Sequence, residues 1–119
     1  MSSQSRKHRG YRTQRVAAEH LAANGFPHAE HVGAGRAGSD ITGCVGIDWE
    51  VKARRNLDLP ALMRQLDERA QDGVLGLGLI RPDGMGEASV GRWPVVLCFD
   101  DAIALLRAAG YGRPPEEET

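Results

Sequence analysis

The sequence predicts a mixed α/β domain in which helices flank a central sheet, and three observations support this. An Ala-rich stretch over residues 10–24 has the composition and length of a helix. Two apolar runs, at residues 74–80 and 94–99, are typical of strands buried on both faces. A second helical stretch at 58–73 separates the first run from a strand-forming region at 41–53. The order is therefore helix, several strands, helix, two strands and a final helix.

The two longer helices have recognisable ends. The first stops at Gly25, a residue that is typical of helix C-terminal caps. In the second helix, Asp58 can cap the N-terminus, Pro60 suits the first turn and Gly73 ends the pattern. Each boundary follows from what glycine, proline and aspartate do to the backbone at helix ends.

The remaining elements are shorter. Residues 26–32 are expected to contain a short strand, and residues 33–40 form a glycine-rich loop. Within 41–53, the glycines at 43 and 46 separate two strands or the two arms of a hairpin. The last helix is expected to begin at residue 100 or 101 and to end at 109, before a glycine.

Length and composition indicate one domain. The chain has 119 residues, of which 41% are hydrophobic, and no apolar run approaches the roughly 20 residues that span a bilayer. The N-terminus lacks a secretory signal, so we expect a soluble intracellular protein. We expect a flexible basic arm over 1–9, one domain over 10–111 and a flexible acidic tail over 112–119. Cys44 and Cys98 lie in separate apolar stretches and are expected to be reduced core thiols.

Charge is distributed unevenly along the chain. Residues 1–55 carry nine Lys and Arg against five Asp and Glu, whereas the remainder carries six against eleven. A basic N-terminal half indicates an anionic partner such as nucleic acid, and a solvated terminus is the alternative. His20, His28 and His31 are loosely spaced like metal ligands, but nothing completes a set, and we expect surface histidines.

The strand "GIDWEVK" at residues 46–52 alternates apolar and charged side chains. In an extended chain, Asp48, Glu50 and Lys52 point to one face and the apolar residues to the other. Three charged groups cannot share a buried face unless something compensates them. Either this face is open to solvent, or its carboxylates hold a divalent cation.

Asp40 lies just before this pair of strands and could complete such a site. A strand running back from Asp40 would bring its carboxylate beside Glu50. Two carboxylates with waters and a phosphate oxygen suit Mg²⁺, which prefers few protein ligands. Lys52 would project into the same site and could steady the charge growing on phosphorus. These residues together predict hydrolysis of phosphodiester bonds.

These residues also carry a resemblance to a known family. "GSD" at 38–40 followed by "EVK" at 50–52 resembles the PD-(D/E)XK nuclease superfamily, with Ser39 where a proline often precedes the aspartate. The wider frame, residues 9–55, is similar to the Holliday junction resolvases of archaea and their phage-borne relatives. The resemblance implies a restriction-endonuclease-like αβββαβ core with a central mixed sheet flanked by helices. It further implies a Mg²⁺-dependent endonuclease of DNA recombination that resolves four-way junctions as a homodimer, in the cytoplasm of a bacterium or a phage-infected cell.

The resemblance assigns roles to individual residues. Asp40 and Glu50 would bind Mg²⁺ or Mn²⁺, aided by the backbone carbonyl of Val51, and Lys52 would be the catalytic lysine. Gln65, in the second helix, resembles a glutamine that several branches of the superfamily direct at the site. A solvated helix glutamine is the alternative for Gln65.

The first helix departs from the pattern of the archaeal resolvases. Those enzymes carry a glutamate followed by arginine, at a spacing before the glycine that corresponds here to Gln14 and Arg15. An amide thus replaces a carboxylate. Glu19 is the alternative ligand, but on a helical wheel it lies beside Arg12 and Arg15, where a surface ion pair is the ordinary explanation. We therefore favour Gln14, which points inward, as the neighbour of the site.

Basic side chains around the site could follow DNA phosphates. The arginines expected to do so are Arg9, Arg12, Arg15, Arg36 and Arg54. Asp48 has no counterpart in the motif and is expected to be exposed at the start of its strand. Three alternatives remain open: a nuclease of the same fold for other DNA structures, a catalytically idle DNA-binding module, and a small interaction protein with a solvated charged face.

Overall fold

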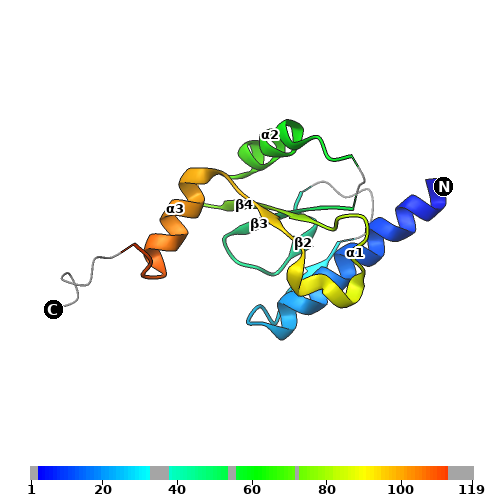
Figure 1. Cartoon of the computed structure of the whole chain (residues 1–119). Helices are drawn as coiled ribbons and strands as arrows, with labels where there is room; N and C mark the ends of the chain where they lie inside the picture. Colours follow the sequence, from blue (N-terminus) through cyan, green and yellow to red (C-terminus); the bar gives the residue numbers. More distant parts are fainter. Residues whose placement is uncertain (1–2, 33–37, 54–55, 72, 113–119) are drawn as a thin grey trace.

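The computed structural model describes residues 3–32, 38–53, 56–71 and 73–112, with side chains from Arg9 onward (Figure 1). In chain order the elements are α1 (Ser3–Ala23), β1 (Glu30–His31), β2 (Ile41–Thr42), β3 (Ile47–Lys52), α2 (Leu59–Arg69), β4 (Leu75–Ile80), the 3₁₀ helix η1 (Glu87–Arg92), β5 (Val95–Val96) and α3 (Phe99–Ala108). Over the described residues, none of the helices has the length and apolar character that crossing a membrane requires.

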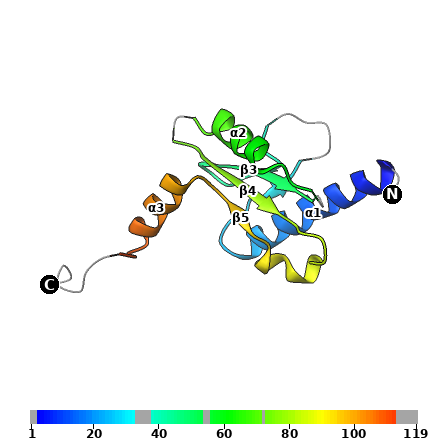
Figure 2. The same ribbon diagram turned by 45° about the horizontal axis from the view of Figure 1, so that its top comes forward.

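The sheet of this domain is mixed. β3 and β4 are parallel, β4 and β5 are antiparallel, and the three strands lie side by side (Figure 2). β1 and β2 form a separate antiparallel pair. Helix α2 makes the crossover between the two parallel strands, as parallel neighbours require. The predicted mixed α/β class is therefore confirmed at this level.

Helix α2 covers one face of the sheet at close range (Figure 1). Its buried residues Leu62 and Leu66 pack over Gly78 and Gly76 of β4. A Cβ added at Gly76 would lie 2.9 Å from the backbone oxygen of Leu66, and one at Gly78 would lie 3.0 Å from Leu62 Cδ2. The glycines of β4 therefore set how near the helix can approach.

Helices α1 and η1 cover the opposite face, where the larger apolar cluster lies. The buried members of this cluster are Ala17, Ala18, Ile41, Cys44, Trp49, Leu77, Leu79 and Trp93. The apolar side of β3 was predicted, and it lies in this core together with Ala17 and Ala18 of α1. Cys44 is a buried free thiol, as expected.

The ends of the helices differ from the predictions in instructive ways. Helix α1 begins at Ser3 rather than at Gly10, so the segment expected to be a flexible arm is helical from Ser3. Residues 3–9 contain no proline or β-branched side chain, and one internal glycine costs a helix only about 1 kcal/mol. Helix α2 begins as predicted, with the Asp58 side chain accepting a hydrogen bond from the N–H of Ala61, but it ends at Arg69 before Gly73 is reached.

The C-terminal part of the chain is less buried than its apolar composition predicted. The run at 94–99 contributes only Val95 and Val96 to the sheet, and Val95 is exposed. Phe99 begins α3 instead of extending the strand, and 80% of its surface is accessible. The predicted burial of this run is therefore wrong, because β5 is an edge strand and no element covers its outer side among the described residues.

Candidate functional site

Asp40 is anchored to the outer edge of β3 by three hydrogen bonds. The Ser39 hydroxyl accepts the N–H of Trp49 at 2.9 Å, and the N–H of Asp40 donates to the Trp49 carbonyl at 2.8 Å. The Asp40 carboxylate then accepts the N–H of Val51 through Oδ2 at 2.7 Å. Two side chains thus make contacts that a neighbouring strand would otherwise make, and this fixes Asp40 against the strand that carries Glu50.

The Val51 carbonyl lies on the same edge of β3 as Asp40. On the other edge, Gly46 and Lys52 turn their carbonyls to β4, where they accept the N–H groups of Leu75 and Arg81 at 2.8 Å. Backbone groups alternate between the two edges along a strand, so the Val51 carbonyl faces away from β4. The Val51 carbonyl oxygen and the Asp40 carboxylate therefore lie on the same edge of β3.

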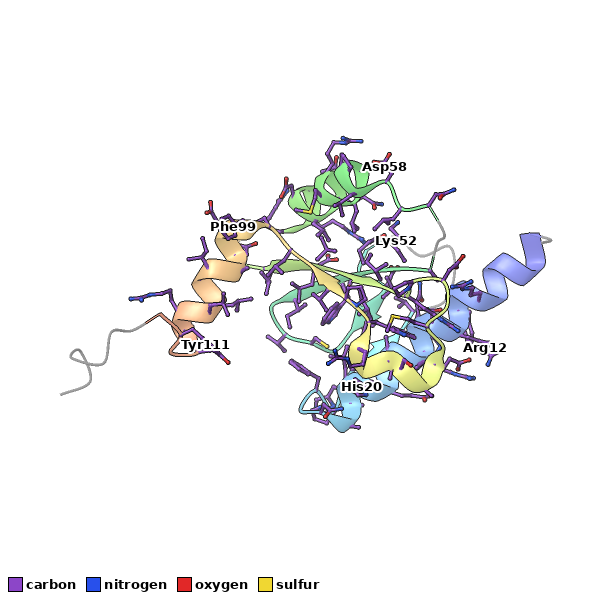
Figure 3. The ribbon with its side chains drawn as sticks, in the orientation of Figure 1. Arg12, His20, Lys52, Asp58, Phe99 and Tyr111 are labelled. Carbon is purple, nitrogen blue, oxygen red and sulfur yellow. The ribbon has the colours of Figure 1, made fainter. Side chains whose placement is uncertain are left out.

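The charged side chains of β3 face helix α2. Asp48 and Glu50 are directly opposite Gly76 and Gly78 in the parallel register, and paired residues point to the same face. Since those glycines lie under α2, the carboxylates lie there too. Figure 3 shows Lys52 between the sheet and α2. This face is not open to solvent: Glu50 is only 7% exposed.

A basic residue of α2 compensates the buried carboxylates. The Arg69 guanidinium contacts Glu50 Oε2 through Nη1 and lies 3.7 Å from Asp48 Oδ2 through Nε. Lys52 Nζ is 3.3 Å from the other oxygen of Glu50. Both oxygens of Glu50 therefore have a cationic partner. One partner comes from β3 itself and the other from α2.

Sequence reasoning missed Arg69, although a signal was present. Leu62, Leu66 and Arg69 are spaced i, i+4 and i+7, which places all three on one side of a helix. The first two are the buried face of α2, so an arginine at the third position must point at the sheet. The expectation that Asp48 is exposed is wrong for the same reason, because Arg69 covers it and 18% of its side chain is accessible.

Burial controls the titration of the two aspartates. It raises the pKa of Asp40 above its ordinary value of 3.8, and the Val51 N–H opposes that rise. The neighbouring Glu50 raises the pKa of Asp40 further, while Arg69 and Lys52 lower it. Burial also raises the pKa of Asp48, with Arg69 acting against it. These mutual effects show that Asp40, Asp48, Glu50, Lys52 and Arg69 form one electrostatic cluster.

This cluster could hold a hard divalent cation only if water and phosphate supply most of its ligands. Across residues 3–32, 38–53, 56–71 and 73–112, no three His, Cys, Asp or Glu side chains converge into a group that could hold a metal ion. A Mg²⁺ ion, however, commonly uses one or two carboxylates and fills its other positions with water and phosphate. Asp48 Oδ1 is buried without a hydrogen-bond partner, which is an unmet demand for a cation or donor at this point.

The two predicted glutamines lie on opposite sides of the sheet. Gln65 is half-buried on α2, one turn before Arg69. Gln14 is half-buried on α1, beside the buried Ala17 and Ala18, and therefore on the apolar side. Among the described residues, neither amide makes a hydrogen bond to Glu50. Glu19 lies on the outer side of α1, 3.7 Å from Arg15, which is the surface ion pair expected for it.

Among the described residues, the arginines that were expected to contact DNA form ion pairs with different acidic residues. Arg9 is 3.2 Å from Asp83, and Arg12, labelled in Figure 3, pairs with Glu87, the first residue of η1. Arg9 also lines a hollow of about 270 Å³ together with Arg81. Surface pairs of this kind are weak and leave both arginines available to an anionic partner. Arg36 and Arg54 lie outside the described residues.

Comparisons of this chain with protein-family models, with curated proteins and with solved structures returned no match.

Proposed function

We propose that this protein is a metal-dependent endonuclease that hydrolyses phosphodiester bonds in DNA, with four-way junctions as its preferred substrate. The supporting observation is the hydrogen bond from the Val51 N–H to Asp40, which holds that carboxylate on the strand that carries Glu50 and Lys52. Two acids and a lysine in one partly desolvated cluster suit phosphoryl chemistry, because a fixed ammonium can stabilise the charge that develops on phosphate oxygens.

Asp40 and Glu50 would hold a Mg²⁺ or Mn²⁺ ion, and the Val51 carbonyl would complete the protein's share of its ligands. Such an ion, when bound, polarises a phosphodiester and lowers the pKa of water. Lys52 would donate hydrogen bonds to the phosphate, and Asp48 would balance the charge of Arg69. The unpartnered Oδ1 atom of Asp48 supports a site that gains a cation or donor on binding.

Arg69 has to leave Glu50 before a metal ion can bind there. Both demand the same oxygen, since Nη1 of Arg69 contacts Oε2 and Lys52 already contacts Oε1. A released guanidinium would lie beside the bound ion, where it can form two parallel hydrogen bonds with a phosphate group. The proposed nuclease therefore exchanges an internal ion pair for metal and substrate.

The experiment compares a synthetic four-way junction with a linear duplex of the same sequence, each incubated with Mg²⁺, Mn²⁺ or EDTA. We expect paired symmetric nicks in the junction that disappear with EDTA and with Glu50→Gln. Gln14→Ala is the control: Gln14 lies on the apolar side of the sheet, away from Glu50, so this variant should leave cleavage intact.

Each outcome of this experiment has a distinct meaning. Equal cutting of the linear duplex would overturn the junction preference and leave a nuclease for other DNA structures. If the protein binds the four-way junction tightly but does not cleave it with either Mg²⁺ or Mn²⁺, it is instead a catalytically idle DNA-binding module. That second function is favoured by one observation, the pairing of Arg69 with the very oxygen that a metal would use. Absence of both binding and cleavage would overturn the proposal altogether.

A further inference from the structure

Helix α3 presents its apolar side chains to solvent. It contains no buried residue, and it projects from the sheet toward the C-terminus of the chain (Figure 1). Phe99 is 80% exposed, Leu106 50% and Ile103 42%. Figure 3 shows Phe99 at the start of α3, where the chain leaves the sheet, and Tyr111 beyond the other end of the helix. An isolated helix of ten residues is marginal in water, so a face of this kind calls for a partner.

The side chains of α3 follow a self-complementary pattern. At about 100° per residue, Phe99, Ile103 and Leu106 share one face of the helix. Asp100, at the start of α3, and Arg107, at its end, both lie on the same flank of that face. The midpoint of the apolar residues and the midpoint of the charged pair both fall next to Ile103.

We propose that this face of α3 binds α3 of a second copy of the chain in an antiparallel, two-fold symmetric pair. A two-fold axis near Ile103 brings Phe99 of one copy against Leu106 of the other. The same axis brings the flank that carries Asp100 against the flank that carries Arg107, so both charged pairs form across the interface. Because the copies are identical, each of these contacts occurs twice.

Three features of the helix favour a second copy over an unrelated partner. The order of charges, acidic first and basic last, is complementary to the same sequence running in the opposite direction. Antiparallel packing also aligns the positive end of one helix dipole with the negative end of the other. Finally, Ala102 lies beside Ile103 at the edge of this face and leaves room for two helix axes to approach within about 8–10 Å. This proposal does not depend on nuclease activity.

The first test measures the molar mass of the full-length protein by light scattering and sedimentation over a range of concentrations. We expect a dimer that becomes a monomer in Ile103→Asp, with the far-UV circular dichroism preserved because Ile103 is not part of the core. Ala104→Asp is the matched control: it introduces the same charge on the opposite side of the same helix, and it should leave the dimer intact.

Charge reversal distinguishes this pairing from any other use of α3. Asp100→Arg and Arg107→Asp should each raise the dimer dissociation constant about 3- to 10-fold, because like charges then face each other twice. The double variant should restore the dissociation constant. Both reversals oppose the helix dipole, so the double variant has the less stable helix and its recovery cannot come from the monomer. The contact of Arg107 with the Gly112 carbonyl is lost in both Arg107 variants and cancels in the comparison.

Several results would overturn the proposal. A protein that is monomeric at all concentrations would show that the face serves another partner. A dimer that survives Ile103→Asp would place the interface elsewhere. The same conclusion would follow if the double charge reversal raised the dimer dissociation constant by the product of the two single effects instead of restoring it. The function proposed above is tested separately, because monomeric Ile103→Asp retains Asp40, Glu50 and Lys52.

Discussion

The two faces of the sheet are opposite in chemistry although they belong to the same strands. On the face toward α1, Trp49 of β3 and Leu77 and Leu79 of β4 are buried in a continuous apolar cluster. On the face toward α2, Asp48 and Glu50 of β3 lie beside strand positions occupied by glycine. The first face is built to be stable, and the second gives up apolar contacts to hold charges.

The comparison shows how a small domain can bury a reactive cluster. The glycines of β4 let α2 approach closely, and this brings Arg69 within reach of β3. Burial of paired charges contributes little net stability, because desolvation offsets much of the attraction. The apolar face must therefore supply most of the free energy of folding, and the charged face is free to serve a function.

The largest expected effect comes from breaking the apolar face. Trp49→Ala should lower the free energy of unfolding by about 3–5 kcal/mol, since it removes a large buried side chain and leaves a cavity. Urea denaturation monitored by circular dichroism measures the change. Trp49→Phe is the control and should lose less, because it keeps a ring in the core and removes an indole N–H that has no partner.

A smaller loss of stability is expected when a side chain is added to β4 beneath α2. Gly76→Ala should destabilise by about 1–3 kcal/mol, because its Cβ would lie 2.9 Å from a backbone oxygen that cannot rotate away. Gly86→Ala provides the control, as no atom lies within 4 Å of a Cβ there and the backbone is extended. Equal stability of the two variants would contradict the role given to the β4 glycines.

Removing Arg69, the cation that covers the charged face, should change both metal affinity and thermal stability. Arg69→Gln should raise the affinity for Mn²⁺ about tenfold, equivalent to about 1.4 kcal/mol, because the metal no longer competes with a guanidinium for Glu50. The metal-free protein should melt at a lower temperature, since Asp48 and Glu50 lose their counter-charge.

Titration calorimetry with Mn²⁺ and thermal melts in EDTA report these two effects of Arg69→Gln separately. Arg64→Gln, at an exposed position of the same helix, should change neither quantity. Unchanged Mn²⁺ affinity in Arg69→Gln would mean that the arginine and the metal do not share a site.

The smallest effect concerns pH. Burial raises the pKa of Asp40 above 3.8, so its ionised form opposes folding at neutral pH, and protonation relieves this as the pH falls through the raised value. Asp40→Asn should therefore be more stable than the wild type near pH 7, with the introduced amide oxygen still accepting the Val51 N–H. The difference in melting temperature should shrink as the pH is lowered toward about 4. A difference that stays constant or grows on acidification would contradict this sign.

The predictions from sequence succeeded where local chemistry decides the outcome. Asp58 caps α2 as expected, and the run at 74–80 is a buried strand because its apolar side chains have no other place to go. They failed where distant segments decide. The run at 94–99 has a buried composition but lies at an edge, and the exposed position expected for Asp48 ignored a helix that returns over it. Helix α1 extends past its expected start because nothing in residues 3–9 stops it.

The alternation in "GIDWEVK" by itself determined that β3 would have one apolar and one charged face, because successive side chains of a strand point in opposite directions. It also placed Glu50 and Lys52, two residues of the proposed chemistry, on the charged face. Only the tertiary structure decided what lies over the charged face. The parallel register sets the carboxylates beside glycines, α2 fills the space above them, and Arg69 reaches Glu50 from a part of the chain that strand periodicity cannot identify.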